Sequence, residues 1–260
     1  MADAARPLAG RAALITGVSR REGIGFATAH RLASQGARIA IQGFARDDPG
    51  QPVTSKTGVD AVVEELRAVD PGVVFIDADF AEAAAAERVV SAAVAARGPL
   101  DILIANHARS SANSLDDVTA DELDLSFAVN ARGSILLAQA FAAQHDGTRG
   151  GRIVLMTSGQ GGSAMPEELA YAVSKGAIQQ MTRTLAAHLM HRGITVNTIN
   201  PGPTDTGWAD AATRAEVERI MPTGRWGSPA DAARLIAMLC SDEASWVTGQ
   251  VIDADGGFSL

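Results

Sequence analysis

The chain of 260 residues has few of the residues that build disulfides or metal sites. Cys240 is the only cysteine, which excludes an intrachain disulfide and a cysteine-based metal site. No apolar run reaches the roughly 18 residues of a membrane helix, and the N-terminal segment lacks the apolar core of a signal peptide. The formal net charge of -8 disfavours nucleic acid and anionic membranes as partners. We therefore expect a soluble protein of the reducing cytoplasm.

Aromatic residues are also scarce, at 4% of the chain, and Tyr171 is the only tyrosine. Hydrophobic residues still make up 47% of the chain, and glycine occurs 26 times. A chain rich in Ala, Val, Ile, Leu and Gly suits a parallel sheet that is covered by helices on both faces. Its length fits one large α/β domain better than two small ones.

Short apolar runs alternate with segments of helical periodicity along the whole chain. The runs that predict strands are residues 12–16, 38–42, 73–76, 100–105, 153–156, 194–199 and 250–253. The segments that predict helices are residues 23–35, 59–69, 81–97, a part of 120–144, and 170–191. Strands separated by helices imply right-handed crossovers and a doubly wound, mostly parallel α/β sheet of seven strands. Because no repeat or low-complexity linker divides the chain, we predict a single domain over residues 1–260.

A glycine-rich turn joins the first predicted strand to the first predicted helix. Gly17, Gly23 and Gly25 would let its backbone turn tightly and approach a pyrophosphate seated on the helix N-terminus. A glycine cluster alone is as typical of an ordinary turn. The strand before it and the helix after it are what make a phosphate-binding role credible.

Ser158, Tyr171 and Lys175 are the strongest catalytic candidates. Ser158 follows a predicted strand, while Tyr171 and Lys175 are four residues apart on one face of a predicted helix. A phenol with a pKa of about 10 is a poor acid or base at neutral pH, but a nearby ammonium group draws its pKa downward. Tyr171 could then exchange a proton with a substrate oxygen that Ser158 holds. The alternative is a tyrosine that only packs and a lysine whose stem covers apolar surface.

Two longer irregular segments follow strands. Residues 43–58 are rich in Gly, Pro and Asp and form either a mobile surface loop or part of a cofactor pocket. Residues 201–227 hold a short amphipathic piece at 211–220. Ligands of open α/β sheets bind beyond the carboxyl ends of the strands, so residues 203–227 are placed to act as a substrate lid.

Taken in order, these motifs resemble those of the short-chain dehydrogenase/reductase family over residues 8–258. The motifs that carry the resemblance are the glycine turn at 16–25, Asp79, Ala-Asn-His-Ala at 105–108, Asn130, Ser158, Tyr171 with Lys175, Pro-Gly at 201–202, Thr206, and the tail from Gly-Arg at 224–225 to Asp-Gly-Gly at 255–257. The resemblance implies a single-domain Rossmann fold and an NAD(P)(H)-dependent oxidoreductase that interconverts a ketone and a secondary alcohol. It also suggests 3-oxoacyl thioesters as substrates, with polyols, steroids and secondary-metabolite ketones as alternatives. A non-catalytic dinucleotide-binding sensor is the alternative of another class.

The resemblance also implies roles for individual residues. Tyr171 would be the general acid or base, Ser158 would orient the substrate oxygen, and Asn130 would support a proton-relay water. Lys175 would bind the nicotinamide ribose and lower the pKa of the phenol. The expected cofactor-binding residues are Gly17, Ser19, Arg20, Gly23, Ile24, Gly25, Asp79, Phe80, Asn106, Tyr171, Lys175, Pro201, Gly202, Thr204 and Thr206.

Three positions depart from the family pattern. Five residues separate Gly17 from Gly23, two more than usual, so the phosphate loop is enlarged. His107 stands where relatives carry a smaller residue, and it either touches substrate or is a loop histidine without such a role. Gly43 ends the second strand, where NAD-preferring relatives carry an acid for the ribose hydroxyls.

The last departure bears on the choice of cofactor. Arg20, Arg21 and Arg46 lie near the expected 2'-phosphate site, and Gly43 brings no carboxylate to it. We therefore expect NADP(H) rather than NAD(H), because guanidinium groups bind phosphate bidentately. The two aspartates at 47–48 argue in the other direction.

The remaining aromatic and histidine residues have structural roles in this interpretation. Trp208 could line the substrate pocket, whereas Trp226 and Trp246 are expected to pack the C-terminal region. His188 and His191 share a helix face but lack the further ligands of a metal site, so no metal is expected.

The predicted helices within 120–144 and 170–191 are apolar on more than one face. Such helices predict burial against another subunit, and we expect a homo-oligomer, either a tetramer or a dimer. A small carbonyl or alcohol substrate is the other expected partner.

Overall fold

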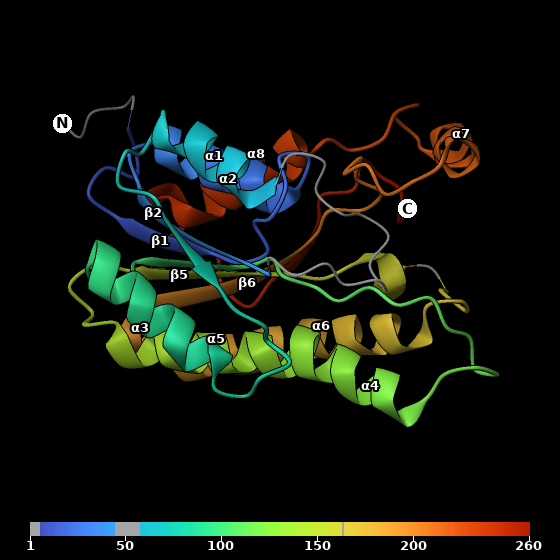
Figure 1. The fold of residues 1–260 in the computed structure, drawn as a ribbon, viewed down its shortest axis with the longest axis horizontal. Helices are drawn as coiled ribbons and strands as arrows, with labels where there is room; N and C mark the ends of the chain where they lie inside the picture. Colours follow the sequence, from blue (N-terminus) through green and yellow to red (C-terminus); the bar gives the residue numbers. More distant parts are fainter. Residues whose placement is uncertain (1–5, 45–57, 163) are drawn as a thin grey trace.

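The computed structural model describes residues 6–44, 58–162 and 164–260. Within them, seven parallel strands form one sheet in the order β3-β2-β1-β4-β5-β6-β7 (Figure 1). The strands are β1 (Ala12–Ile15), β2 (Arg38–Gly43), β3 (Val74–Asp77), β4 (Ile102–Ala105), β5 (Gly151–Met156), β6 (Ile194–Asn200) and β7 (Val251–Asp253). The predicted seven-stranded α/β sheet is confirmed.

Helices cover both faces of this sheet (Figure 1). One layer holds α1 (Ile24–Ser34), α2 (Gly58–Arg67) and α8 (Pro229–Cys240). The other layer holds α3 (Ala85–Arg97), α4 (Ala120–Ser126), α5 (Gly133–Gln144) and α6 (Leu169–Leu189), with a π-helix at Phe127–Arg132 between α4 and α5. α7 (Ala211–Ile220) stands apart from both layers. Short 3-10 turns lie at Gly159–Gly161, Met190–Arg192 and Asp242–Ala244.

The five inner strands are apolar because both of their faces are buried, whereas the edge strands β3 and β7 are partly exposed. Along β1, Ala13 and Ile15 pack into the core under α1 and α8, whereas Ala12 and Leu14 pack into the core under α3 and α5. All four side chains are fully buried. Two-sided burial explains why the strands read as continuous apolar runs rather than as an alternating pattern.

The position of the site follows from the strand order. β1 pairs with β2 on one side and with β4 on the other, and the helices after β1 and β4 cover opposite faces of the sheet. Connections that leave two neighbouring strands in opposite directions open a crevice at the carboxyl ends of those strands.

Two helices differ from the expectation. α3 begins at Ala85 rather than at residue 81, because Asp79 Oδ1 accepts from the Ala81 backbone N–H at 2.8 Å and holds the chain in turns before the helix. α8 has no counterpart among the predicted helices. It begins with a capping box in which Ser228 and Asp231 each accept from the other's backbone N–H, and Pro229 lies in its first turn.

Candidate active site

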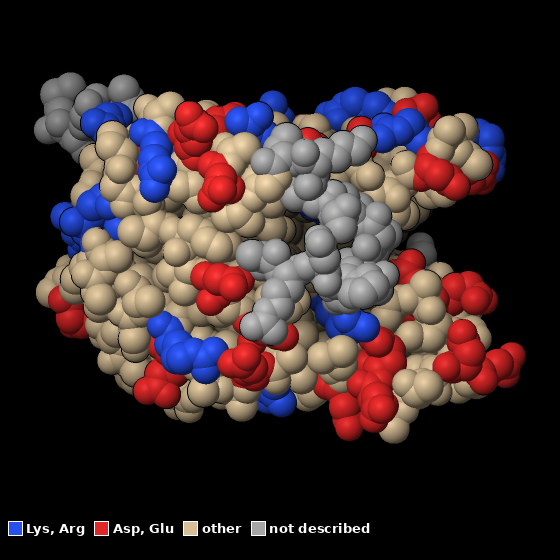
Figure 2. Space-filling view, viewed as in Figure 1, with Lys and Arg blue, Asp and Glu red and all other residues tan. Residues whose placement is uncertain are grey.

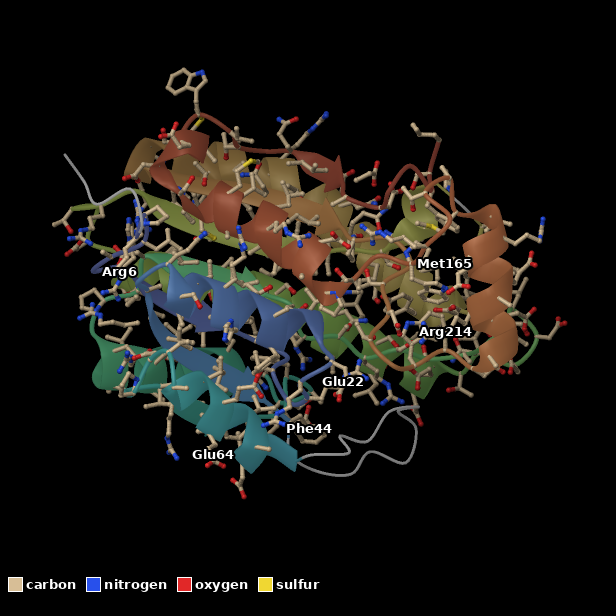
Figure 3. All side chains as sticks on the ribbon, turned by 90° about the horizontal axis from the view of Figure 1, so that it is seen from above. Arg6, Glu22, Phe44, Glu64, Met165 and Arg214 are labelled. Atoms are coloured by element: carbon tan, nitrogen blue, oxygen red, sulfur yellow. The ribbon has the colours of Figure 1, made fainter. Side chains whose placement is uncertain are left out.

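A cavity of about 1070 Å³ lies beyond the carboxyl ends of the strands. One side consists of residues that follow β1, β2 and β3, and the other of residues that follow β4, β5 and β6 together with α7. The surface is notched between the regions of α7 and α4 (Figure 2). Seen from above, Phe44 lies near α2 and Met165 lies toward α7, so these two lining residues mark different ends of the cavity (Figure 3).

Most of the predicted site residues line this cavity. Ser158, Tyr171 and Lys175 do so. The cofactor candidates that line it besides Tyr171 and Lys175 are Gly17, Ser19, Arg20, Gly23, Ile24, Asp79, Phe80, Asn106, Pro201, Gly202, Thr204 and Thr206. Gly25 and Asn130 are buried outside its lining.

The glycine turn after β1 leaves no room for side chains. A Cβ atom on Gly25 would stand 2.5 Å from the Gly17 carbonyl oxygen, and Gly17 has a φ of +70°, which favours glycine. Asn106 Nδ2 donates to the carbonyls of Thr16 and Gly17, both at 3.1 Å, and ties the end of β4 to the turn. Gly23 precedes α1 and offers no side-chain acceptor to its first N–H groups, which suits an anion at this end of the helix.

The enlarged loop directs its two arginines to different places. Arg20 donates to the Thr206 carbonyl at 3.1 Å and to the Thr206 hydroxyl at 3.4 Å, so it links the turn to the predicted lid. Arg21 pairs with Glu65 of α2 at 2.8 Å and does not line the cavity. Arg46 and residues 47–48 lie outside the described residues.

The end of β2 has no room for an acidic side chain. A Cβ atom on Gly43 would lie 2.9 Å from the Phe75 ring and 3.0 Å from the Val18 carbonyl oxygen. Phe44, the next residue, lines the cavity. The missing carboxylate at this position therefore has a steric cause.

Tyr171 and Lys175 lie one turn apart on α6 and face the end of β5. Lys175 Nζ lies 5.7 Å from the centroid of the Tyr171 ring and donates to the Met156 carbonyl at 2.9 Å. The Ser158 hydroxyl makes a hydrogen bond with the phenol of Tyr171. The Thr157 hydroxyl donates to the Lys175 carbonyl at 3.0 Å and fixes α6 against the strand end. The structure thus brings the three catalytic candidates together.

The ionisation of this group differs from the expectation. Burial raises the pKa of Tyr171, the hydrogen bond from Ser158 lowers it, and the negative charge of Glu168 raises it. Burial lowers the pKa of Lys175 to about 8. The predicted lowering of the Tyr171 pKa by Lys175 is therefore wrong for the chain's own groups. Burial costs the phenolate more hydration free energy than the hydrogen bond from Ser158 restores. The Lys175 ammonium donates to the Met156 carbonyl instead of to the phenol.

Asn130 lies in the π-helix and connects three parts of the site. Its Oδ1 accepts from the Arg109 backbone N–H at 2.7 Å, and its Nδ2 donates to the Arg109 carbonyl at 2.9 Å and to the Ser174 hydroxyl at 2.8 Å. π-Helical turns are rare and occur frequently at functional sites. Asn130 thus holds the loop after β4 against α6, next to Lys175. Its role toward a water stays a prediction.

His107 lines the cavity as a buried, neutral imidazole. Nε2 lies 3.0 Å from the Val129 carbonyl, which can only accept, so Nε2 carries the proton and Nδ1 accepts from the Thr16 hydroxyl at 2.8 Å. Burial and then the charge of Lys175 lower the pKa of His107 to about 3, against a hydrogen bond with Val129 that raises it. Its ring packs on Phe80 at 4.1 Å between centroids. The side chain braces the cavity wall.

The predicted lid segment is held by a tryptophan and an ion pair. Asp205 pairs with Arg214 of α7 through two hydrogen bonds of 2.7 Å. Trp226 is buried, donates to the Arg214 carbonyl at 3.0 Å and meets Trp208 at 5.7 Å between ring centroids. Trp208 lines the cavity, as its prediction stated. The expectation that Trp246 packs is wrong, because its side chain is 97% exposed.

Several lining residues have no counterpart among the predicted ones. Among them are Arg109, Ser110, Leu125, Val129, Met165, Glu168, Val217 and Phe258. Most sit in loops and helix ends that only the tertiary structure brings together. Among residues 6–44, 58–162 and 164–260, no three His, Cys, Asp or Glu side chains gather closely enough to hold a metal ion, and none of the helices has the length and hydropathy of a membrane span.

The chain matches known proteins over nearly its whole length. Residues 17–259 match the family model described as enoyl-(acyl carrier protein) reductase. The uncharacterized oxidoreductase YjdA of Bacillus subtilis is 40% identical, over 95% of this chain and 96% of the relative. The NADPH-dependent aldehyde reductase-like protein, chloroplastic, of Arabidopsis thaliana is 36% identical, over 97% of this chain and 95% of the relative.

Two solved structures have the same fold as this chain. A short-chain dehydrogenase/reductase from Serratia marcescens has a TM-score of 0.86 at 34% identity, with 98% of this chain and 100% of that chain covered. A blue fluorescent protein from a metagenomic library, solved in complex with NADPH, gives the same TM-score of 0.86, identity of 34% and coverage of 98% and 100%. Fold and site together define an NAD(P)-dependent oxidoreductase that acts on CH–OH or C=O groups. The chain belongs to the short-chain dehydrogenase/reductase family, as its motifs predicted.

Proposed function

We propose that this protein reduces a ketone to a secondary alcohol with Tyr171 as the proton donor. The proposal rests on the phenol of the only tyrosine, which is hydrogen-bonded to Ser158 and lies one turn from the buried Lys175 on the cavity wall. The raised pKa of Tyr171 keeps the phenol protonated at neutral pH, and a proton donor needs this form. A carbonyl oxygen held by Ser158 would receive that proton.

The residues on the cavity wall fit a nicotinamide dinucleotide. The end of α1 would hold the pyrophosphate, Asp79 and Phe80 would line the adenine side, and Pro201 and Gly202 would hold the nicotinamide end. When bound, the nicotinamide supplies the hydride that reaches the carbonyl carbon. The chain itself orients the carbonyl, excludes water and delivers the proton to its oxygen.

A panel of ketones tests this proposal against a non-catalytic sensor. A reductase consumes NADPH only when a suitable ketone is present and forms the matching alcohol. A sensor binds NADPH and consumes none with any ketone of the panel.

We also propose NADP(H) as the preferred cofactor. The crowded end of β2 excludes a carboxylate at Gly43. The ion pair of Arg21 with Glu65 is solvent-exposed, so breaking it to let Arg21 bind a phosphate costs little free energy. The structural neighbour that binds NADPH supports the same choice.

We expect kcat/KM for NADPH to exceed that for NADH by about tenfold or more, the effect of one good charge-assisted contact. Arg21→Gln is expected to lower the value for NADPH and to leave the value for NADH nearly unchanged. Steady-state kinetics with both cofactors measures this. Higher values with NADH would contradict the preference.

The substrate class remains part of the proposal. Leu125, Met165, Val217 and Phe258 give the substrate side of the cavity an apolar wall. Such a wall suits a substrate with an apolar portion, such as a 3-oxoacyl thioester. Polyols, steroids and secondary-metabolite ketones are the alternatives.

We further propose a homo-oligomer, either a tetramer or a dimer, in the cytoplasm. Large apolar side chains are exposed along α4, the π-helix, α5 and α6: Leu123 at 39%, Phe127 at 49%, Ile135 at 41% and Val173 at 57%. Several large exposed apolar side chains on these helices support burial against another subunit. Sedimentation equilibrium is expected to give a multiple of 26.8 kDa. A monomer at all concentrations tested would refute the assembly.

A further inference from the structure

Glu168 brings a carboxylate to the wall of the cavity, next to the catalytic phenol. It immediately precedes α6 and lies three residues before Tyr171, so both side chains belong to the same turn. The backbone here is fixed by Asn113, whose carbonyl accepts from the Leu169 N–H at 2.9 Å and whose side chain accepts from the Ala170 N–H at 3.3 Å. The carboxylate is therefore held at the substrate side of the cavity.

This carboxylate lacks a partner within the described part of the chain. Arg109 lines the same cavity, but it binds Glu122 through hydrogen bonds of 3.0 and 2.8 Å. Lys175 donates to a carbonyl, and Glu168 is half-buried without a hydrogen bond or ion pair to its side chain among the described residues. Burial raises the pKa of Glu168, which reflects the cost of holding this charge away from water. A donor on a bound molecule would remove that cost.

We propose that Glu168 is a specificity-determining residue that selects ketones with a hydroxyl or ammonium donor near the carbonyl and rejects ketones with an anion there. This inference rests on the proposed ketone reduction. A donor on a short chain beyond the reacting carbon can hydrogen-bond the carboxylate while Tyr171 and Ser158 hold the carbonyl oxygen. An anionic group in the same place faces a like charge in a site of low polarity.

The same charge acts on the phenol. The groups that face Tyr171 from the surrounding elements are Lys175 on its own helix, Ser158 after β5, the neutral His107 after β4, and Glu168. Of these, Glu168 carries the negative charge that opposes ionisation of the phenol. Loss of this charge would make Tyr171 more acidic.

Matched ketones test the selection. The probes are 5-hydroxypentan-2-one and levulinate, which differ in carrying a hydroxymethyl or a carboxylate group at the same carbon. We expect kcat/KM to favour the hydroxyketone in the wild type and Glu168→Gln to lower the ratio of the two values by about fivefold or more. Glu167→Gln, an exposed neighbour with the same loss of charge, is expected to keep the wild-type ratio. A ratio that stays unchanged in Glu168→Gln overturns the inference.

Titration of the phenol gives a second readout that needs no turnover. Because Tyr171 is the only tyrosine, the ultraviolet absorbance of phenolate reports on this residue alone. Phenolate is expected to form at lower pH in Glu168→Gln than in the wild type and in Glu167→Gln. Identical titrations overturn the inference even if the enzyme reduces ketones. A shifted titration with no turnover of either ketone means instead that the proposed function fails while the coupling of Glu168 to the phenol holds.

Discussion

Tyr171→Phe is expected to lower kcat by roughly 10²- to 10⁴-fold, the contribution of a positioned general acid. The change removes the phenol oxygen and leaves the ring in place. Lys175, Asn106 and the glycine turn remain, so the dissociation constant of NADPH is expected to stay within about tenfold of the wild-type value, since the loss of one hydrogen bond costs about 1 kcal/mol. Steady-state kinetics and fluorescence titration of NADPH measure the two quantities.

The Ser158→Ala variant serves as the companion. It keeps the phenol but removes the group that orients the substrate oxygen, so a smaller loss of kcat is expected than in Tyr171→Phe. Wild-type turnover in Tyr171→Phe would remove the phenol from the mechanism. If Tyr171→Phe weakened NADPH binding by the same factor by which it lowered kcat, the phenol would be a cofactor-binding group only.

Lys175→Met is expected to lower kcat by about 10²-fold or more while it makes the folded protein more stable. Lys175 is 2% exposed, and burial lowers its pKa to about 8 from the usual 10.5. Below pH 8 the folded chain therefore holds a buried ammonium that the unfolded chain exposes to water. Replacing it with a similar apolar side chain is expected to raise the free energy of unfolding at pH 7 by about 2 kcal/mol, after the lost bond to the Met156 carbonyl is subtracted.

The sign of the pH dependence follows from the same shift. Between about pH 8 and 10.5 the unfolded chain binds more protons at Lys175 than the folded chain does, so the contribution of this residue to stability rises with pH in this window. The advantage of Lys175→Met should thus be largest below pH 8 and shrink above it. Urea unfolding at a series of pH values measures it. Lower stability than the wild type at pH 7 would contradict the buried charge.

The fold could be predicted from the sequence because its five inner strands are buried on both faces. Apolar runs at all seven strands identified the sheet, and their alternation with helical segments identified its parallel topology. Local capping was harder to see. The start of α3 depends on the turn at Asp79, and α8 depends on the capping box of Ser228 and Asp231. The π-helix at Phe127–Arg132 has no periodicity signal of its own, since one extra residue in a turn leaves the apolar pattern almost unchanged.

The identity of the catalytic residues could be predicted because they occur in short sequence motifs. Their protonation states could not be predicted because those depend on burial. Ser158, Tyr171 and Lys175 could be grouped from the predicted strand end at Ser158, the four-residue spacing on the helix and the order of the family motifs. The raised pKa of Tyr171 and the neutral state of His107 follow from enclosure by distant segments, which no spacing reports. Glu168 precedes the tyrosine by three residues, but only the tertiary structure shows that its carboxylate lines the cavity and has no partner among residues 6–44, 58–162 and 164–260.

The tryptophans supply an optical probe of the segment that carries α7. Trp208 and Trp226 meet there at 5.7 Å between ring centroids, one half-exposed and one buried, whereas Trp246 already stands in water. Any displacement of this segment changes the surroundings of the first two indoles and leaves the emission of the third constant. Stopped-flow fluorescence on the unlabelled protein can therefore test whether this segment moves during a single turnover, as the predicted lid would.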